Sequence, residues 1–127
     1  MKKSILILSS LVIVLASCAH QPITHSEPVV DVLQPTASTI YNNGDTIHIE
    51  MTLSDEDELH EAFIYVRSDI DTFFNYEPVV HELPSFNVDT FWVVSGMTTG
   101  VSAFVSATAH NHHDLHTTVN VPVTLVP

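Results

Sequence analysis

Alternation of apolar and polar residues is the main pattern of the chain after residue 28. The clearest run covers residues 46–53, in which Ile47, Ile49, Met51 and Leu53 share one side. Side chains of a β-strand point alternately to its two faces, so this run predicts a strand with one buried face. Two further alternating runs, residues 101–109 and 115–125, predict two more strands of this kind near the end of the chain.

The same pattern predicts seven short strands with turn residues between them. They cover residues 29–33, 46–53, 62–67, 73–83, 86–94, 101–109 and 115–125. Asn42-Asn43-Gly44-Asp45 indicates a turn, and the acidic stretch (residues 54–58, Ser-Asp-Glu-Asp-Glu) indicates a loop. We therefore expect an all-β fold, an Ig-like Greek-key β-sandwich of about seven strands over residues 28–127.

The first seventeen residues have the pattern of a signal peptide. Lys2 and Lys3 precede an apolar run of about a dozen residues, shorter than the roughly 20 residues of a membrane-spanning helix. Leu15-Ala16-Ser17-Cys18 resembles the bacterial lipobox, whose cysteine is acylated and becomes the first residue of the mature protein. An ordinary signal peptide with an unrelated cysteine is the alternative. We expect a lipoprotein signal peptide (1–17), a lipidated tether (18–27) and one domain (28–127).

Lipidation of Cys18 would determine where the protein is located, and it would remove the thiol from the possible metal ligands. The acyl chains would hold it at the bacterial cell envelope, as an outer membrane lipoprotein that faces the periplasm or the cell surface. Cys18 is also the single cysteine, so the mature domain has no thiol to offer a metal and no disulfide.

Charge excludes one class of partner. The formal net charge is −12, and it becomes −14 when Lys2 and Lys3 leave with the signal peptide, because Arg67 is then the one strong base. Nucleic-acid binding requires Lys and Arg to neutralise phosphates, so we expect no nucleic-acid partner and favour cations. We also expect no enzyme, since the chain has three glycines and no phosphate loop, nucleophile elbow or His-Glu-x-x-His motif.

Most of residues 28–127 resembles a known group of surface modules, and the motifs that show this lie in residues 35–66. Pro35, the turn at Gly44-Asp45 and the run from Ser54 to Leu59 that leads into Ala62–Val66 are similar to bacterial Ig-like or cadherin-like modules, particularly the single-domain lipoproteins of Bacteroidetes type. The resemblance implies the fold and assigns no function. Those modules commonly have an Asp and a Gly-Asn turn in their final hairpin, whereas residues 109–116 here read Ala-His-Asn-His-His-Asp-Leu-His.

This hairpin holds the most specific chemical signal. Its four histidines are His110, His112, His113 and His116. Neutral imidazole is the commonest metal ligand in proteins and suits Zn or Cu. If Ala109 and Leu115 face the core, His110 and His116 lie opposite each other at the base of a five-residue loop, with Cβ atoms about 4.5–5.5 Å apart. His112 or His113 would then add a third ligand.

The expected topology brings carboxylates to the same place. In an Ig-like sandwich the loop between the second and third strands lies at the same end as the last hairpin, which places Asp55, Asp57 and His60 near the histidines. His81, which precedes Leu83-Pro84, would approach through the next turn. The sequence therefore predicts a mixed His and carboxylate site for a divalent transition metal.

Several alternatives stay open. The acidic stretch could bind calcium, which prefers oxygen ligands, or both segments could be solvated turns without a ligand. Histidines beside carboxylates would also titrate near pH 6–7. A structural or adhesive module that binds an envelope protein or glycan is a separate possibility, suggested by Phe73, Phe74 and Tyr76. His48, His20 and His25 are expected to contribute nothing specific.

Overall fold

The computed structural model describes residues 22–127, so the predicted signal peptide and Cys18 lie outside the described residues. Seven strands form the domain: β1 (Val29–Gln34), β2 (Thr39–Asn42), β3 (Thr46–Arg67), β4 (Thr72–Tyr76), β5 (Leu83–Val93), β6 (Val101–Asn111) and β7 (His116–Val126). Within residues 22–127 no helix is long and apolar enough to cross a membrane.

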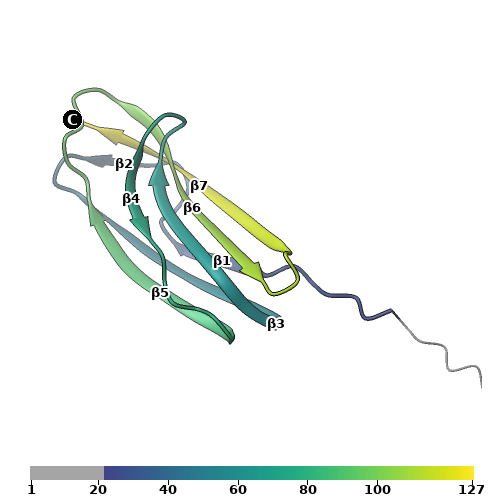
Figure 1. Ribbon diagram of the computed structural model, residues 1–127. Coiled ribbons are helices and arrows are strands. Elements are labelled where there is room, and N and C mark those ends of the chain that lie inside the picture. The colour runs from purple at the N-terminus through teal and green to yellow at the C-terminus, as the bar shows by residue number, and fades with distance from the viewer. Residues whose placement is uncertain (1–21) are drawn as a thin grey trace, which may run out of the picture.

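The long strand β3 belongs to both layers of a sandwich (Figure 1). Its first half pairs antiparallel with β1 on one side and β5 on the other. Its second half pairs antiparallel with β4 and β6, and β7 and β2 continue that layer. The chain passes from β5 in one layer to β6 in the other, which is the crossing expected of an Ig-like Greek key.

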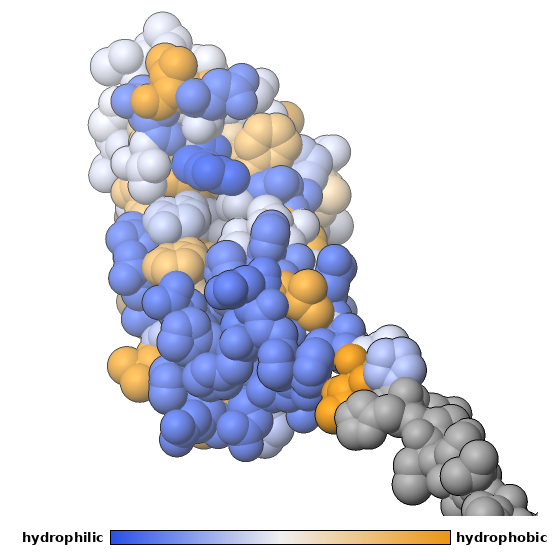
Figure 2. Space-filling model, turned by 45° about the vertical axis from the view of Figure 1, so that its right-hand side comes forward, coloured by the Kyte–Doolittle hydropathy of each residue, from blue (hydrophilic) through white to orange (hydrophobic). Residues whose placement is uncertain are grey.

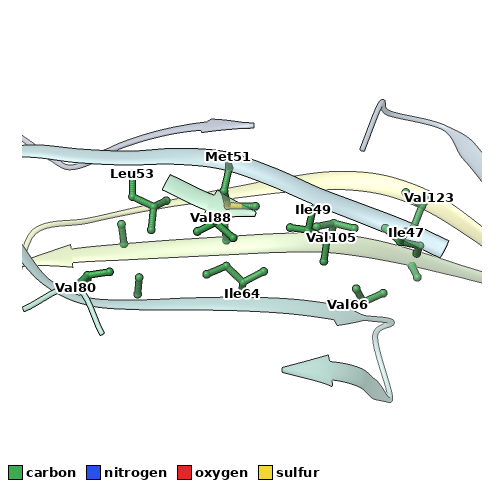
Figure 3. Close-up of a cluster of buried hydrophobic side chains, with 14 of the residues drawn as sticks. Ile47, Ile49, Met51, Leu53, Ile64, Val66, Val80, Val88, Val105 and Val123 are labelled. Atoms are coloured by element: carbon green, nitrogen blue, oxygen red, sulfur yellow. The ribbon is translucent and has the colours of Figure 1, made fainter. Parts of the chain in front are cut away.

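The core lies between the two layers and consists of the alternating apolar residues. Figure 3 shows Ile47, Ile49, Met51 and Leu53 from the first half of β3 facing side chains of the opposite layer. All four are at most 1% exposed. Each fully buried aliphatic side chain contributes roughly 1.5–3 kcal/mol, so a core of this composition can hold the domain together without a disulfide.

Three details of the strand pattern differ from expectation. The acidic stretch is not a loop, because β3 runs through it and joins the predicted strands 46–53 and 62–67. The strand bends there instead: the pairing register shifts between Ser54 and Leu59, and Glu58 has a left-handed backbone, φ 67°. The alternation of buried residues continues as far as Asp55, which is why the backbone stays extended.

Strand β2 was not expected, and the predicted strand 73–83 ends at Tyr76. The four residues of β2 run parallel to β7, a partner at the far end of the chain, so no local pattern marks them. The aromatic residues of β4 are not a free surface either. Phe73 and Phe74 pack against the core, and the Phe73 ring stacks on Trp92 with ring centroids 6.0 Å apart.

Candidate metal sites

The bend of β3, the turn before β5, the β6–β7 hairpin and the tether meet at one end of the molecule (Figure 1). Leu59, just after the bend, is paired with Asn111 of β6, and its carbonyl accepts a hydrogen bond from the Glu82 amide at 2.9 Å. The sequence prediction that the acidic stretch, the turn after His81 and the last hairpin share one end is confirmed, whereas the tether was not expected to lie there. Figure 2 shows hydrophilic side chains gathered over this part of the surface, beside the point where the tether leaves.

Asn111 joins three of these segments. Its side-chain amide donates to the carbonyl of Ser26 in the tether at 3.0 Å and to Asp55 Oδ2 at 3.2 Å. Its side-chain oxygen accepts from the amides of His113 and Leu115 in the hairpin. Asn111 is 1% exposed, so these hydrogen bonds satisfy a buried polar group and fix the positions of the neighbouring side chains.

Three histidines from three different segments converge beside this hub. His60 follows the bend of β3, His81 lies in the turn before β5, and His112 lies in the hairpin turn. Each offers a ring nitrogen within 4.8 Å of the other two. We call His60, His81 and His112 the three-histidine cluster.

Ring positions in this cluster match those of three imidazoles on one tetrahedral ion. The ring centroids are 5.2 Å apart for His60 and His81, 4.7 Å for His60 and His112, and 4.9 Å for His81 and His112. A metal–nitrogen bond of about 2.0–2.1 Å and tetrahedral angles place such centroids about 5 Å apart. The spacing of the three rings therefore allows them to share a metal once their ring nitrogens, which lie within 4.8 Å of one another, turn toward a common point.

One atom of the cluster also needs a partner. Among the residues that the structure describes, the Nδ1 atom of His60 is buried and makes no hydrogen bond. Buried polar atoms normally have a partner, and an imidazole nitrogen can find one in a metal or a water. Carboxylates stand close by: Glu61 lies 3.9 Å from the His60 ring and Glu82 3.8 Å from the His81 ring.

A second group forms where the tether meets the domain. His25 Nδ1 lies 2.9 Å from Asp57 Oδ2, and the His25 ring stacks on His113 with centroids 3.4 Å apart. His25, Asp57 and His113 also offer three ligand atoms within 4.8 Å, and we call them the tether cluster. The expectation that His25 contributes nothing specific is wrong, because His25 makes both of these contacts.

His110 and His116 face each other across the two strands as the sequence predicted. They are paired in register, and their rings stack with centroids 5.1 Å apart. His110 also meets the ring of Phe63 edge-on. Neither residue joins one of the groups of three among residues 22–127, since His112 and His113 turn to the other two clusters.

Asp55 is a buried residue whose carboxylate is engaged in hydrogen bonds within the domain. It is 6% exposed, its Oδ1 accepts from the Asp57 amide at 2.6 Å, and its Oδ2 accepts from Asn111. In the described part of the chain, the acidic stretch forms no group of three carboxylates that could hold a cation, since Asp57 stands with two histidines. This arrangement suits a borderline transition metal better than calcium, which prefers oxygen.

The backbone is bent sharply at this end. Glu58, Glu82 and Asp114 all have positive φ angles, 67°, 64° and 59°. Residues other than glycine rarely adopt this conformation, at a cost of roughly 1–2 kcal/mol each. Each of these positions lies within two residues of a histidine of the two clusters, so the turns that carry the histidines are held in shape by the packing around them.

A comparison with solved structures identifies the fold. The fibronectin(III)-like modules of Clostridium thermocellum CbhA superpose with a TM-score of 0.50 at 12% sequence identity, over 77% of this chain and 96% of that one. The fold is Ig-like. No family model and no curated protein matches the sequence.

Among the sequence-predicted ligands, the structure groups His60, His81 and His112 in one cluster and Asp57 and His113 in the other. His110 and His116 form a separate pair, and Asp55 is engaged by hydrogen bonds. Sequence reasoning missed His25. His25 lies only a few residues before the start of the domain, which could have suggested that it reaches the site. No sequence pattern, however, indicates that the tether folds back onto the domain.

Proposed function

We propose that this protein is a lipid-anchored module of the bacterial envelope that binds a divalent transition metal through His60, His81 and His112. The convergence of three imidazoles from three segments, with centroid distances of 4.7–5.2 Å, carries the proposal. Zn²⁺ and Cu²⁺ are the expected ions, because both accept imidazole nitrogen readily.

The site's exposure favours exchange over permanent burial of the metal. His81 and His112 are exposed and His60 is half-buried, so three protein ligands would leave a fourth position open to water or to another ligand. An open position lets an ion enter and leave without unfolding. Buffering, sensing or handover of the metal at the envelope are the roles that agree with this property, and the formal charge of −14 on the mature chain would attract cations.

Anchoring through Cys18 is part of the proposal. It rests on the lipobox-like residues Leu15-Ala16-Ser17-Cys18, and mass spectrometry of the mature protein tests it. Acyl chains on an N-terminal Cys18 are the expected result. A mature chain without acylation would leave the module free in the periplasm or outside the cell.

The metal site is tested by calorimetric titration of the mature protein in detergent micelles with Zn²⁺ and Cu²⁺. His81→Ala and His112→Ala each remove a ligand from an exposed position, and we expect a loss of affinity of at least about tenfold. His116→Ala removes a histidine of the same hairpin outside the cluster and serves as the matched control, with affinity unchanged. Unaltered affinity in both ligand variants would overturn the site.

A structural or adhesive role at the envelope is the second candidate. It is favoured by the fibronectin III-like fold and by Phe91 and Val93 on β5, which are 65% and 45% exposed. Capture of an envelope protein or glycan that persists with a chelator and is lost in Phe91→Ser would support this role. Capture that requires the metal would instead connect partner binding to the three-histidine cluster.

A further inference from the structure

The described part of the tether lies against the domain. His25 contacts Asp57 and stacks on His113, and the Ser26 carbonyl accepts a hydrogen bond from the buried Asn111 side chain. The side chains of His25 and Asp57 are 30% and 27% exposed, so an ion can reach them from solvent. His25, Asp57 and His113 come from three different segments: the tether, the bend of β3 and the hairpin.

The donor set has a definite preference. Two imidazoles and one carboxylate, with ligand atoms within 4.8 Å of one another, form a donor set that Zn²⁺ accepts, with water in the fourth position. To bind one tetrahedral ion, the stacked rings of His25 and His113 would have to separate from 3.4 Å to about 5 Å between centroids, which rotation of these two exposed side chains allows. Calcium and magnesium take oxygen ligands almost exclusively and would use only Asp57. Without a metal, the described part of the tether is held by the partly exposed His25–Asp57 hydrogen bond and by the hydrogen bond from Asn111 to the Ser26 carbonyl. Each such hydrogen bond contributes only about 0.5–1.5 kcal/mol, so together they constrain a flexible chain weakly.

We propose that His25, Asp57 and His113 bind a second divalent transition metal, and that this ion fastens the tether to the domain. The ligands are not shared with the three-histidine cluster, so this site can exist without that one. The effect on the distance to the membrane rests on the lipid anchor of the proposed function.

Fastening at His25 shortens the free part of the tether. An extended chain from Cys18 to the start of β1 at Val29 reaches at most about 40 Å, at roughly 3.6 Å for each residue step. The same chain from Cys18 to His25 reaches at most about 25 Å. A metal in the tether cluster would therefore draw the histidine-bearing end of the domain toward the membrane and restrict its orientation there.

The test follows metal affinity and tether motion in the same molecule. The mature protein in detergent micelles carries His60→Ala and His81→Ala, which remove the three-histidine cluster, and a nitroxide on Ile23→Cys. Ile23 is 79% exposed and lies two positions before His25, so the label reports on the tether without displacing a packed side chain. Acylated Cys18 would not react with the label, and the sequence has no second cysteine.

We expect one Zn²⁺ to bind this protein and the nitroxide to lose mobility as it does so. His25→Ala in the same background should lower the zinc affinity at least about tenfold and leave the nitroxide mobile. His48→Ala is the matched control, since His48 is an exposed histidine paired with Asp89 away from both clusters, and it should change neither readout.

Zinc binding that is unaffected by His25→Ala would overturn the inference. So would a labelled protein with both clusters intact that binds zinc only through His60 and His81, with no change in nitroxide mobility, although that result supports the proposed function. Absence of zinc binding in the protein with both clusters intact would overturn both.

Discussion

Asn111 connects the parts of the molecule on which both clusters depend. Its amide group makes four hydrogen bonds, to the tether, to Asp55 and to two amides of the hairpin. A leucine of similar size would leave the Asp55 carboxylate and two backbone amides without this partner in a buried place, and an unsatisfied buried polar group costs about 1–3 kcal/mol.

We therefore expect Asn111→Leu to lower the free energy of unfolding by about 2–4 kcal/mol, measured by urea denaturation of the metal-free protein. His116→Ala, at an exposed position on the other strand of the same hairpin, is the control and should leave stability nearly unchanged. An Asn111→Leu protein as stable as wild type would mean that water replaces these hydrogen bonds at no cost.

His112 and His113 show that adjacent residues in the sequence can belong to different clusters. They are adjacent, yet His112 stands with His60 and His81 while His113 stacks on His25. A turn lets consecutive side chains point to opposite sides, so one hairpin supplies two clusters. Variants of these two residues should therefore separate the two proposed metal sites in zinc titrations.

Asp45 gives a prediction at the opposite end of the domain. Its carboxylate accepts hydrogen bonds from the Asn42 backbone amide at 2.7 Å and from the Asn42 side chain at 3.1 Å, and these lower the pKa of Asp45 below its usual range. A carboxyl group whose pKa is lowered in the folded state stabilises the fold at pH values above its unfolded-state pKa of about 3.9. This contribution disappears as the pH falls through the folded-state pKa.

We expect Asp45→Ala to lower the melting temperature at pH 7 and to unfold at the same temperature as wild type near pH 2, as measured by circular dichroism. Asp69→Ala, at an exposed position, is the control and should have little effect at either pH. A deficit of the same size at both pH values would show that the charge of Asp45 is not what stabilises the turn.

At the scale of elements, the bend of β3 is the feature that makes the site. One continuous strand passes from one layer to the other, and the change of direction at residues 54–59 places both Asp57 and His60 at this end. Glu58 supplies the bend by adopting a positive φ, which glycine adopts freely and β-branched residues adopt with most strain.

Glu58→Val should therefore destabilise the domain by about 1–2 kcal/mol relative to Glu58→Gly, as measured by chemical denaturation. Glu56→Val places the same side chain two residues earlier, at an exposed position without a positive φ, and should cost less. If valine were equally tolerated at both positions, the strand would not need the left-handed residue to bend.

At the scale of the whole molecule, the segments that carry both histidine clusters lie at the end from which the tether leaves (Figure 1). A lipid on Cys18 would then hold this end toward the membrane. The outer face of β5 and the opposite end of the domain, where the chain terminates, would remain available to partners. Metal chemistry and partner binding would thus occupy different parts of one small domain.

Metal binding should raise the melting temperature of the protein. An ion that binds only the folded state at one hundred times its dissociation constant adds about 2.7 kcal/mol per site. For a domain of this size that corresponds to a rise in melting temperature of about 10–20 °C. We expect this rise with Zn²⁺ at pH 7.5 and reversal by a chelator, in differential scanning calorimetry.

At pH 5 the rise should be much smaller, because protons compete for imidazole nitrogens and the ligand must be neutral. The sign follows from the ligand chemistry: metal affinity increases as the pH rises through the range in which imidazoles lose their protons. Equal stabilisation at both pH values would indicate carboxylate ligands in place of the histidines.

The strands could be predicted because their cause is local. Ile47, Ile49, Met51 and Leu53 alternate with polar residues, and burial of one face is enough to specify an extended backbone. The common end of the bend and the hairpin also followed from the sequence, since Ig-like topology requires it. The pairing of β2 with β7 could not be predicted, because it depends on the other strands already being in place.

The residue types of the candidate site were evident in the sequence, and their grouping was not. The density of histidines at residues 110–116 and the carboxylates near residue 55 indicate transition-metal chemistry by composition alone. Which histidines meet depends on where three turns and the tether place their side chains, to within a few ångströms. The alternation of strands carries no such information. The sequence therefore determined the fold and the side chains available to a site, while only the tertiary structure brought His60 to His81 and His112, and His25 to Asp57 and His113.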